Sequence, residues 1–144
     1  MTIPKVKKKV LFLCNHNSAR SQMAEGLLKS LYGEHYDAYS AGSNPSCVSP
    51  FAVKVMGEVG VDISGNRSKS IQEFEGIKFD YVVTVCGGEG EACPFFHGGE
   101  TYLHESFEDP VAVDGNLDEK INAFRKTRDE IKDWINKTFE VSEC

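Results

Sequence analysis

A cysteine and an arginine separated by five residues are the most chemically suggestive feature of this sequence. Residues 14–21 read Cys-Asn-His-Asn-Ser-Ala-Arg-Ser, so a candidate nucleophile, Cys14, is followed by a candidate anion ligand, Arg20. An arginine guanidinium can bind a tetrahedral oxyanion through two parallel hydrogen bonds. Positive charge near a cysteine also favours the thiolate, which is the reactive form. The pattern therefore predicts attack by Cys14 on an oxyanion.

The segments on either side place this motif in a loop between a strand and a helix. An apolar run over residues 10–13 precedes it, and residues 22–31 repeat apolar side chains at helical spacing. Such a loop offers free backbone N–H groups and the partial positive charge of the helix N-terminus. We expect it to bind the oxyanion through Asn15, His16, Asn17, Ser18, Ala19 and Arg20. The residues alone also allow a polar turn with a buried, inert cysteine.

Strands and helices alternate along the whole chain. We expect strands over residues 9–14, 37–41, 80–85 and 102–106, and helices over 20–31, 50–59 and 117–138. A turn-rich segment over 62–74 and a loop over 86–99 complete the order. This alternation predicts an α/β fold with parallel strands, which bind ligands at their carboxyl ends. Cys14 and Cys86 each follow a strand, so they share one crevice if those strands are near neighbours.

Length and composition indicate one domain, spanning residues 1–144, with enough apolar residues for a sizeable core. The net charge is −6, from 16 Lys and Arg against 22 Asp and Glu, which makes nucleic acid or an anionic membrane a poor partner. No run approaches the ~18 apolar residues of a membrane span. The N-terminus also lacks the apolar region of a signal peptide. We expect a cytoplasmic protein and a monomer.

Five cysteines in a short cytoplasmic chain favour reactive thiols over a disulfide framework. Cys93 follows Cys86 across Gly-Gly-Glu-Gly-Glu-Ala, a segment that little packing would restrain. Two alternatives remain: a pair of buried small apolar side chains, or a zinc site that includes His97 and His104. The gap of six residues departs from the usual zinc spacing. No role is assigned to Cys47 or Cys144.

The Cys-x5-Arg motif and its surroundings resemble the low-molecular-weight protein tyrosine phosphatase superfamily. The resemblance rests on residues 14–21, the Gln-Met-Ala-Glu-Gly that follows, and Tyr39-Ser-Ala-Gly42, and it extends over residues 9–137. The thioredoxin-coupled arsenate reductases of this superfamily are the closer match, because the order strand, Cys86, six residues, Cys93 and proline resembles their redox pair. The resemblance implies a three-layer α/β sandwich with a four-stranded parallel sheet.

The resemblance also implies a reaction, the reduction of arsenate to arsenite. Cys14 would form an adduct with arsenate, and Cys86 would attack the sulfur of that adduct, release arsenite and leave a Cys14–Cys86 disulfide. Cys93 would then attack Cys86 and move the disulfide outward, where thioredoxin would reduce it. Glutaredoxin could serve the same chemistry. Phosphate and sulfate are expected to compete with arsenate, and no cofactor is implied.

Other site residues follow from the same resemblance. Asp109, followed by a proline, sits where the general acid is expected, although Asp-Pro is also a common turn dipeptide. Ser21 could donate a hydrogen bond to the Cys14 sulfur, and Asn17 is expected to hold the shape of the loop. His16 either tunes Cys14 or faces the solvent.

Two departures from the family pattern matter. Phosphatases acting on phosphotyrosine usually have tyrosines after the Asp-Pro, whereas this chain has Val-Ala-Val at residues 111–113. Some arsenate reductases hold potassium near the loop, at positions matching Asn17, Glu25 and Ser40 and two residues of the stretch 64–70. Here that stretch carries Arg67 and Lys69, so we expect no bound metal, with the Lys69 ammonium or a solvated basic loop in its place.

Two other functions remain open at this stage. A phosphatase would use the same loop and the same Asp109, with water resolving a phosphocysteine in place of Cys86. A non-catalytic sensor could bind an oxyanion and respond to redox state through the same cysteines. The Cys86/Cys93 pair and the missing tyrosines favour reduction over ester hydrolysis.

Overall fold

A four-stranded parallel sheet lies at the centre of the computed structural model, which describes residues 7–86 and 93–140. The strands are β1 (Lys8–Cys14), β2 (Tyr36–Gly42), β3 (Phe79–Thr84) and β4 (Gly99–His104), in the order β2-β1-β3-β4. The expected parallel sheet is confirmed. The glycine-rich segment 87–92 and Cys144, both discussed above, lie outside the described residues.

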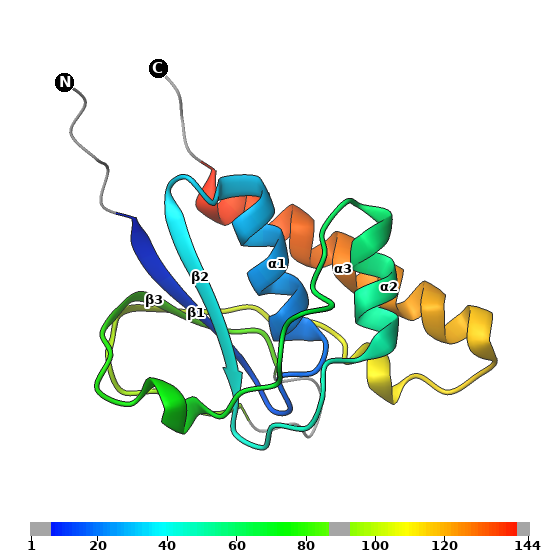
Figure 1. The fold of residues 1–144 in the computed structure, drawn as a ribbon, viewed down its shortest axis with the longest axis horizontal. Coiled ribbons are helices and arrows are strands. Elements are labelled where there is room, and N and C mark those ends of the chain that lie inside the picture. Colours follow the sequence, from blue (N-terminus) through cyan, green and yellow to red (C-terminus); the bar gives the residue numbers. More distant parts are fainter. Residues whose placement is uncertain (1–6, 87–92, 141–144) are drawn as a thin grey trace.

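Three α-helices cover one face of this sheet: α1 (Arg20–Tyr32), α2 (Pro50–Glu58) and α3 (Leu117–Phe139). Figure 1 shows them gathered on one side of the strands, with the short 3-10 helix η1 (Ile71–Phe74) on the other. A second short 3-10 helix, η2 (Pro110–Ala112), leads towards α3. Together with the segment around Phe96, η1 packs on the second face, so the expected three layers are present.

The core follows from the alternation of side chains along β1. Val10 and Phe12 point into the helix-covered face, whereas Leu11 and Leu13 point into the smaller cluster with Phe96. All four side chains are fully buried, as expected for a central parallel strand covered on both faces. The buried strand anchors the loop that begins at Cys14.

The last helix shows clear local signals in the sequence. Asn116 caps it by accepting a hydrogen bond from the Glu119 N–H at 2.9 Å, while the Glu119 side chain accepts from the Asn116 N–H. Its apolar stripe is buried against the core through Ile121, Phe124, Ile131, Ile135 and Phe139. Although α3 is long, no helix within residues 7–86 and 93–140 is apolar enough to cross a membrane.

The expected start of the last strand was wrong by three residues. β4 begins at Gly99 rather than Tyr102, because Gly99 pairs in register with Phe79 of β3. The sequence around Gly98 and Gly99 is typical of a turn, and most of β4 is exposed, so its apolar alternation is weak. The pairing of the whole sheet, rather than local propensity, extends this strand.

Candidate active site

Cys14 ends β1 and is almost completely buried at the floor of the predicted loop. Its Sγ lies 2.8 Å from the hydroxyl oxygen of Ser21, in the first turn of α1. That hydroxyl also accepts a hydrogen bond from the Asn17 side-chain amide at 2.8 Å. Because the oxygen already accepts from Asn17, the hydroxyl proton can point at the sulfur, where it would stabilise a thiolate.

Asn17 has the contacts of a residue that shapes the loop. It is fully buried and has a positive φ of 49°, the only such non-glycine residue in the described parts of the chain. Its side-chain oxygen accepts hydrogen bonds from Gln22 Nε2 at 2.7 Å and from the Lys69 N–H at 2.9 Å. Asparagine tolerates this left-handed conformation better than most residues do. These contacts support the expected role of Asn17.

The outer side of the loop is held by the segment that follows β2. The carbonyl oxygens of Asn15, His16 and Ser18 accept hydrogen bonds from backbone N–H groups within residues 44–49, at 2.8 to 3.2 Å. In a planar trans peptide the C=O and the next N–H point in opposite directions. The N–H groups that follow these carbonyls therefore point away from the segment, which is the orientation that an anion-binding loop needs.

Gly42 allows this close approach. A Cβ at this position would lie 2.6 Å from the Asn15 carbonyl oxygen and 2.8 Å from the Asn17 nitrogen. Any side chain here would push the loop out of place, because both neighbours are backbone atoms. No local pattern in the sequence indicates this role of Gly42, because the backbone that approaches it lies more than 20 residues earlier in the chain.

The loop opens into a cavity of about 80 Å³. It is lined by Cys14, His16, Ser18, Ala19, Arg20, Ser46, Asp109 and Val111. This volume is small beside the ~300–1,000 Å³ of pockets for drug-sized ligands, so a small oxyanion is the better fit. Of the predicted oxyanion ligands, Asn15 and Asn17 do not line it. The exposed His16 bonds through Nδ1 to the Asn44 carbonyl oxygen at 3.0 Å.

Arg20 and Asp109 meet across this cavity. Arg20 is nearly buried; it donates to the Phe107 carbonyl oxygen at 3.2 Å, and its Nη2 lies 3.6 Å from Asp109 Oδ2. The other carboxylate oxygen of Asp109 accepts from the Val111 N–H at 3.0 Å, which caps η2. Ala19, at the N-terminus of α1, makes no side-chain cap and lines the cavity with Arg20, so this helix end can add partial positive charge there.

Replacing Arg20 by lysine should lower kcat/KM for the oxyanion substrate strongly while the protein remains folded. A lysine ammonium is a point charge and cannot reproduce the two parallel hydrogen bonds of the guanidinium. The loss should be on the order of 2–3 kcal/mol of transition-state stabilisation. Steady-state kinetics would check this, with circular dichroism as the folding control. An unchanged kcat/KM would place Arg20 outside the reacting site.

Cys86 and Cys93 are joined by a disulfide, with their Cα atoms 5.7 Å apart, an ordinary separation for such a bond. Cys14 remains a free thiol. The Val85 N–H donates to the Leu13 carbonyl oxygen at 2.9 Å, so the ends of β3 and β1 lie side by side. Cys14 and Cys86 both belong to the buried cluster on the helix-covered face, at the same carboxyl edge of the sheet, but only Cys14 of the two lines the cavity, so a crevice shared by both cysteines is not seen among the described residues.

The zinc alternative finds no support in the described residues. His104 bonds through its two ring nitrogens to the hydroxyls of Thr84 and Ser106, at 2.6 and 3.1 Å. Across residues 7–86 and 93–140, no three His, Cys, Asp or Glu side chains come together as ligands would. The two candidate thiolates, Cys86 and Cys93, share a disulfide instead.

A buried polar network behind the loop surrounds Glu25. Its carboxylate accepts from the Ser40 hydroxyl at 2.9 Å, and the Lys69 ammonium lies 3.8 Å away. Lys69 also donates to the Arg67 carbonyl oxygen at 3.1 Å. Burial lowers the pKa of Lys69, and the Coulombic attraction of Glu25 opposes that shift. The ammonium therefore lies beside Glu25, one of the positions where the sequence resemblance suggested cation ligands.

Two members of this network were missed from the sequence. Gln22 bridges the Asn17 side chain and the Arg67 carbonyl oxygen, and Asn66 donates to both Gln22 and Glu25. Gln22 directly follows the motif at residues 14–21, so its position could have marked it as a residue that supports the loop. Nothing in the local pattern marks Asn66, because its partners lie more than 40 residues away along the chain.

The chain matches a known protein family and a known relative along almost its whole length. Residues 9–142 match the family described as low molecular weight phosphotyrosine protein phosphatase. An arsenate reductase of Halalkalibacterium halodurans is 45% identical over 133 residues, which cover 92% of this chain and 95% of the relative.

The solved structures that resemble this chain include further arsenate reductases. An arsenate reductase in the phosphate-binding state matches with a TM-score of 0.77 at 35% identity, covering 90% of this chain and 95% of that one. A thioredoxin-dependent arsenate reductase of Corynebacterium glutamicum matches with a TM-score of 0.61 at 29% identity, covering 94% of this chain and 65% of that one.

Proposed function

This chain belongs to the low molecular weight phosphotyrosine protein phosphatase family and, within it, to the arsenate reductases; we propose that it works through a Cys14/Cys86/Cys93 disulfide relay recycled by thioredoxin. One observation carries the proposal. A disulfide between Cys86 and Cys93 lies at the end of the strand next to the one that presents Cys14 in an oxyanion-sized cavity. The thioredoxin-dependent relative from Corynebacterium glutamicum supports the choice of reductant.

In the first step, arsenate binds in the cavity and the Cys14 thiolate attacks arsenic. The guanidinium of Arg20 and the loop N–H groups stabilise the charge on the arsenate oxygens, as in other oxyanion sites. Asp109, 3.6 Å from Arg20, protonates the oxygen that leaves as water. Ser21, 2.8 Å from the sulfur, stabilises the thiolate before attack and again when the sulfur is displaced.

Replacing Asp109 by asparagine should slow formation of the thiol–arsenate adduct, because an amide cannot give up a proton to the leaving oxygen. Exchange between the Cys86–Cys93 disulfide and an added thiol should stay at the wild-type rate. Rapid-quench single-turnover kinetics would measure the first step. An unaffected rate of adduct formation would show that another group is the acid.

In the second step, the Cys86 thiolate attacks the Cys14 sulfur of the adduct. The S–As bond breaks, its electron pair stays on arsenic, and arsenite leaves while a Cys14–Cys86 disulfide forms. The Cys93 thiolate then attacks Cys86, which frees Cys14 and produces the Cys86–Cys93 disulfide. The structure has a free Cys14 and a bonded Cys86 and Cys93, which is the arrangement on which this proposed cycle ends.

The reductant is tested by a coupled assay. Arsenite release should continue over many turnovers with thioredoxin, thioredoxin reductase and NADPH. It should stop after about one turnover with glutathione and glutaredoxin, because the proposed cycle ends on a protein disulfide rather than on a glutathione adduct. Equal turnover with both systems would contradict the choice of thioredoxin.

Phosphate and sulfate should act as competitive inhibitors. We propose a cytoplasmic monomer as the working form.

Phosphatase activity is the alternative function, and the same residues allow it. Cys14, Arg20 and Asp109 line one cavity and would suffice for a phosphocysteine that water hydrolyses. The margin of the cavity does not favour aryl phosphates, because the 57% exposed Val111 stands where an aromatic ring would stack on the substrate. We therefore propose that any hydrolysis of phosphomonoesters is a side activity of the reductase.

Arsenate reduction should proceed at the same rate in sodium and in potassium buffers of equal ionic strength. The reason is that the Lys69 ammonium already lies 3.8 Å from the buried Glu25 carboxylate, and we propose that it supplies the positive charge there. The measurement is the initial rate of arsenite release across a titration of potassium chloride against sodium chloride. A several-fold activation by potassium would contradict this assignment of Lys69.

A further inference from the structure

The Cys86–Cys93 disulfide offers only one of its two sulfurs to a partner protein. Cys86 is fully buried in the core, whereas Cys93 is only partly buried at its edge. Which sulfur an external thiolate attacks depends on access as well as on thiol chemistry. With the disulfide formed as it is here, a reducing protein can reach Cys93 and not Cys86. The surface next to Cys93 must therefore be covered during reduction.

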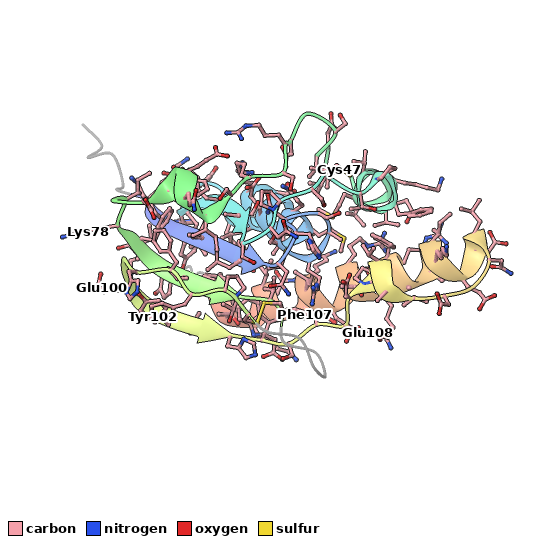
Figure 2. All side chains as sticks on the ribbon, turned by 90° about the horizontal axis from the view of Figure 1, so that it is seen from below. Cys47, Lys78, Glu100, Tyr102, Phe107 and Glu108 are labelled. Carbon is pink, nitrogen blue, oxygen red and sulfur yellow. A yellow bond between two sulfur atoms is a disulfide. The ribbon has the colours of Figure 1, made fainter. Side chains whose placement is uncertain are left out.

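An aromatic pair occupies that surface. Phe95 follows Cys93 by two residues and is 63% exposed, which makes it one of the two most exposed large apolar side chains among the described residues. Its ring stacks on the ring of Tyr102 from β4, with centroids 5.4 Å apart and planes 18° apart. Tyr102 is itself 46% exposed. Figure 2 shows Tyr102 on the outermost strand, at the margin of the sheet.

The pair is held in place by local contacts. The Tyr102 hydroxyl donates to the Phe96 carbonyl oxygen at 2.9 Å and accepts from the Gly99 N–H at 3.1 Å. Phe95 also makes a T-shaped contact with the His97 ring, with centroids 4.6 Å apart. Neither Phe95 nor Tyr102 belongs to the two buried clusters, so the core does not account for their placement.

We propose that the stacked Phe95–Tyr102 pair is the docking platform for the dithiol protein that reduces the Cys86–Cys93 disulfide. This inference rests on the proposed thioredoxin coupling and adds the surface that the reductant recognises. Phe95 is exposed and its Cα lies within about 7 Å of that of Cys93, so a partner that brings a sulfur to Cys93 comes within reach of the aromatic pair. Rigid, exposed aromatic rings are the side chains that most often carry binding energy at protein interfaces, because little conformational entropy is lost on contact.

Reduction of the Cys86–Cys93 disulfide on this platform takes two thiol–disulfide exchange steps, in which electrons and protons balance. A thiolate of the partner attacks Cys93 Sγ, the Cys86–Cys93 bond breaks, and Cys86 leaves as a thiolate that takes up a proton. The partner's second thiol then attacks the partner's first sulfur, the one bonded to Cys93 in the mixed disulfide. The bond to Cys93 breaks, and Cys93 leaves as a thiolate. The partner ends as a disulfide, having supplied two electrons and two protons, and both cysteines end reduced.

Phe95→Ala should raise the KM for thioredoxin and lower kcat/KM for thioredoxin about tenfold, the effect of losing a contact of about 1.4 kcal/mol. The KM for arsenate should not change. Turnover with dithiothreitol, a small dithiol that needs no platform, should also match the wild type. Phe95→Trp keeps an aromatic ring and should restore most of the rate with thioredoxin.

Leu117→Ala is the matched control, because Leu117 is 62% exposed at the first residue of α3. Figure 2 shows this end of α3 at the opposite end of the molecule from Tyr102, so the control should leave the KM for thioredoxin unchanged.

The possible outcomes distinguish a failure of the docking platform from a failure of the proposed reductant. A wild type that turns over with dithiothreitol but not with thioredoxin would overturn both. A wild type that works with thioredoxin, together with a Phe95→Ala variant of unchanged kcat/KM, would overturn the platform alone. Equal losses with thioredoxin and dithiothreitol would also overturn it, since Phe95 would then act on the fold rather than on docking.

Discussion

Replacing Cys14 by serine should abolish arsenate reduction and any hydrolysis of p-nitrophenyl phosphate. The serine hydroxyl stays protonated near neutral pH, so the loop would keep its hydrogen-bond donors but lose its nucleophile. Because both activities begin with the same attack, both should fall by at least about 1,000-fold. Arsenite release and p-nitrophenol formation are the two measurements, made on the same preparation.

Cys47→Ser is the matched control for this experiment. Cys47 is the other free cysteine among the described residues, and it is exposed. It follows Ser46, which lines the cavity, but does not line the cavity itself. Its replacement should leave both activities near the wild-type rate. Substantial turnover by Cys14→Ser in either assay would mean that Cys14 is not the nucleophile.

Replacing Cys86 or Cys93 by serine should each stop multiple-turnover arsenate reduction with thioredoxin, yet leave hydrolysis of p-nitrophenyl phosphate largely in place. Water can resolve a phosphocysteine without either thiol, whereas release of arsenite needs Cys86 and recycling needs Cys93. The anchors of the oxyanion loop come from residues 42–49 and 66–69, so neither substitution should disturb the cavity.

The two variants should differ in a single turnover. Cys93→Ser should release about one equivalent of arsenite, because its Cys86 can still displace Cys14, whereas Cys86→Ser should release little. Quantifying arsenite after mixing each reduced variant with excess arsenate makes the comparison. If both variants kept wild-type turnover with thioredoxin, the relay would be wrong and the phosphatase function would take its place.

The parts of the fold that the sequence predicted well are those with strong local signals. The apolar run of β1 and the capped, amphipathic α3 were expected within one residue of their observed bounds. A parallel sheet followed from the alternation of strands and helices, whereas the pairing of β1 with β3, which brings Cys14 and Cys86 to one edge, was left open by the sequence. Local propensity and the global fold agree in these elements, which is why a single sequence sufficed.

Features that depend on distant backbone could not be predicted in the same way. Gly42 matters because the loop at Asn15 approaches it, and Asn66 matters because it meets Gln22 and Glu25. Neither contact has a local pattern. The start of β4 at Gly99 depends on register with β3, against the turn tendency of its own residues. The pairing of Cys86 with Cys93 came from resemblance to relatives, since spacing alone also allowed a zinc site.

Mapping the disulfides by mass spectrometry tests the relay most directly. The fully reduced wild type and the Cys93→Ser variant are each mixed with one equivalent of arsenate, quenched with a thiol-blocking reagent and digested. The wild type should carry a Cys86–Cys93 disulfide with Cys14 blocked as a free thiol, which is the arrangement in the structure. The variant should carry a Cys14–Cys86 disulfide. Free Cys86 in both proteins after arsenite has been released would contradict the relay.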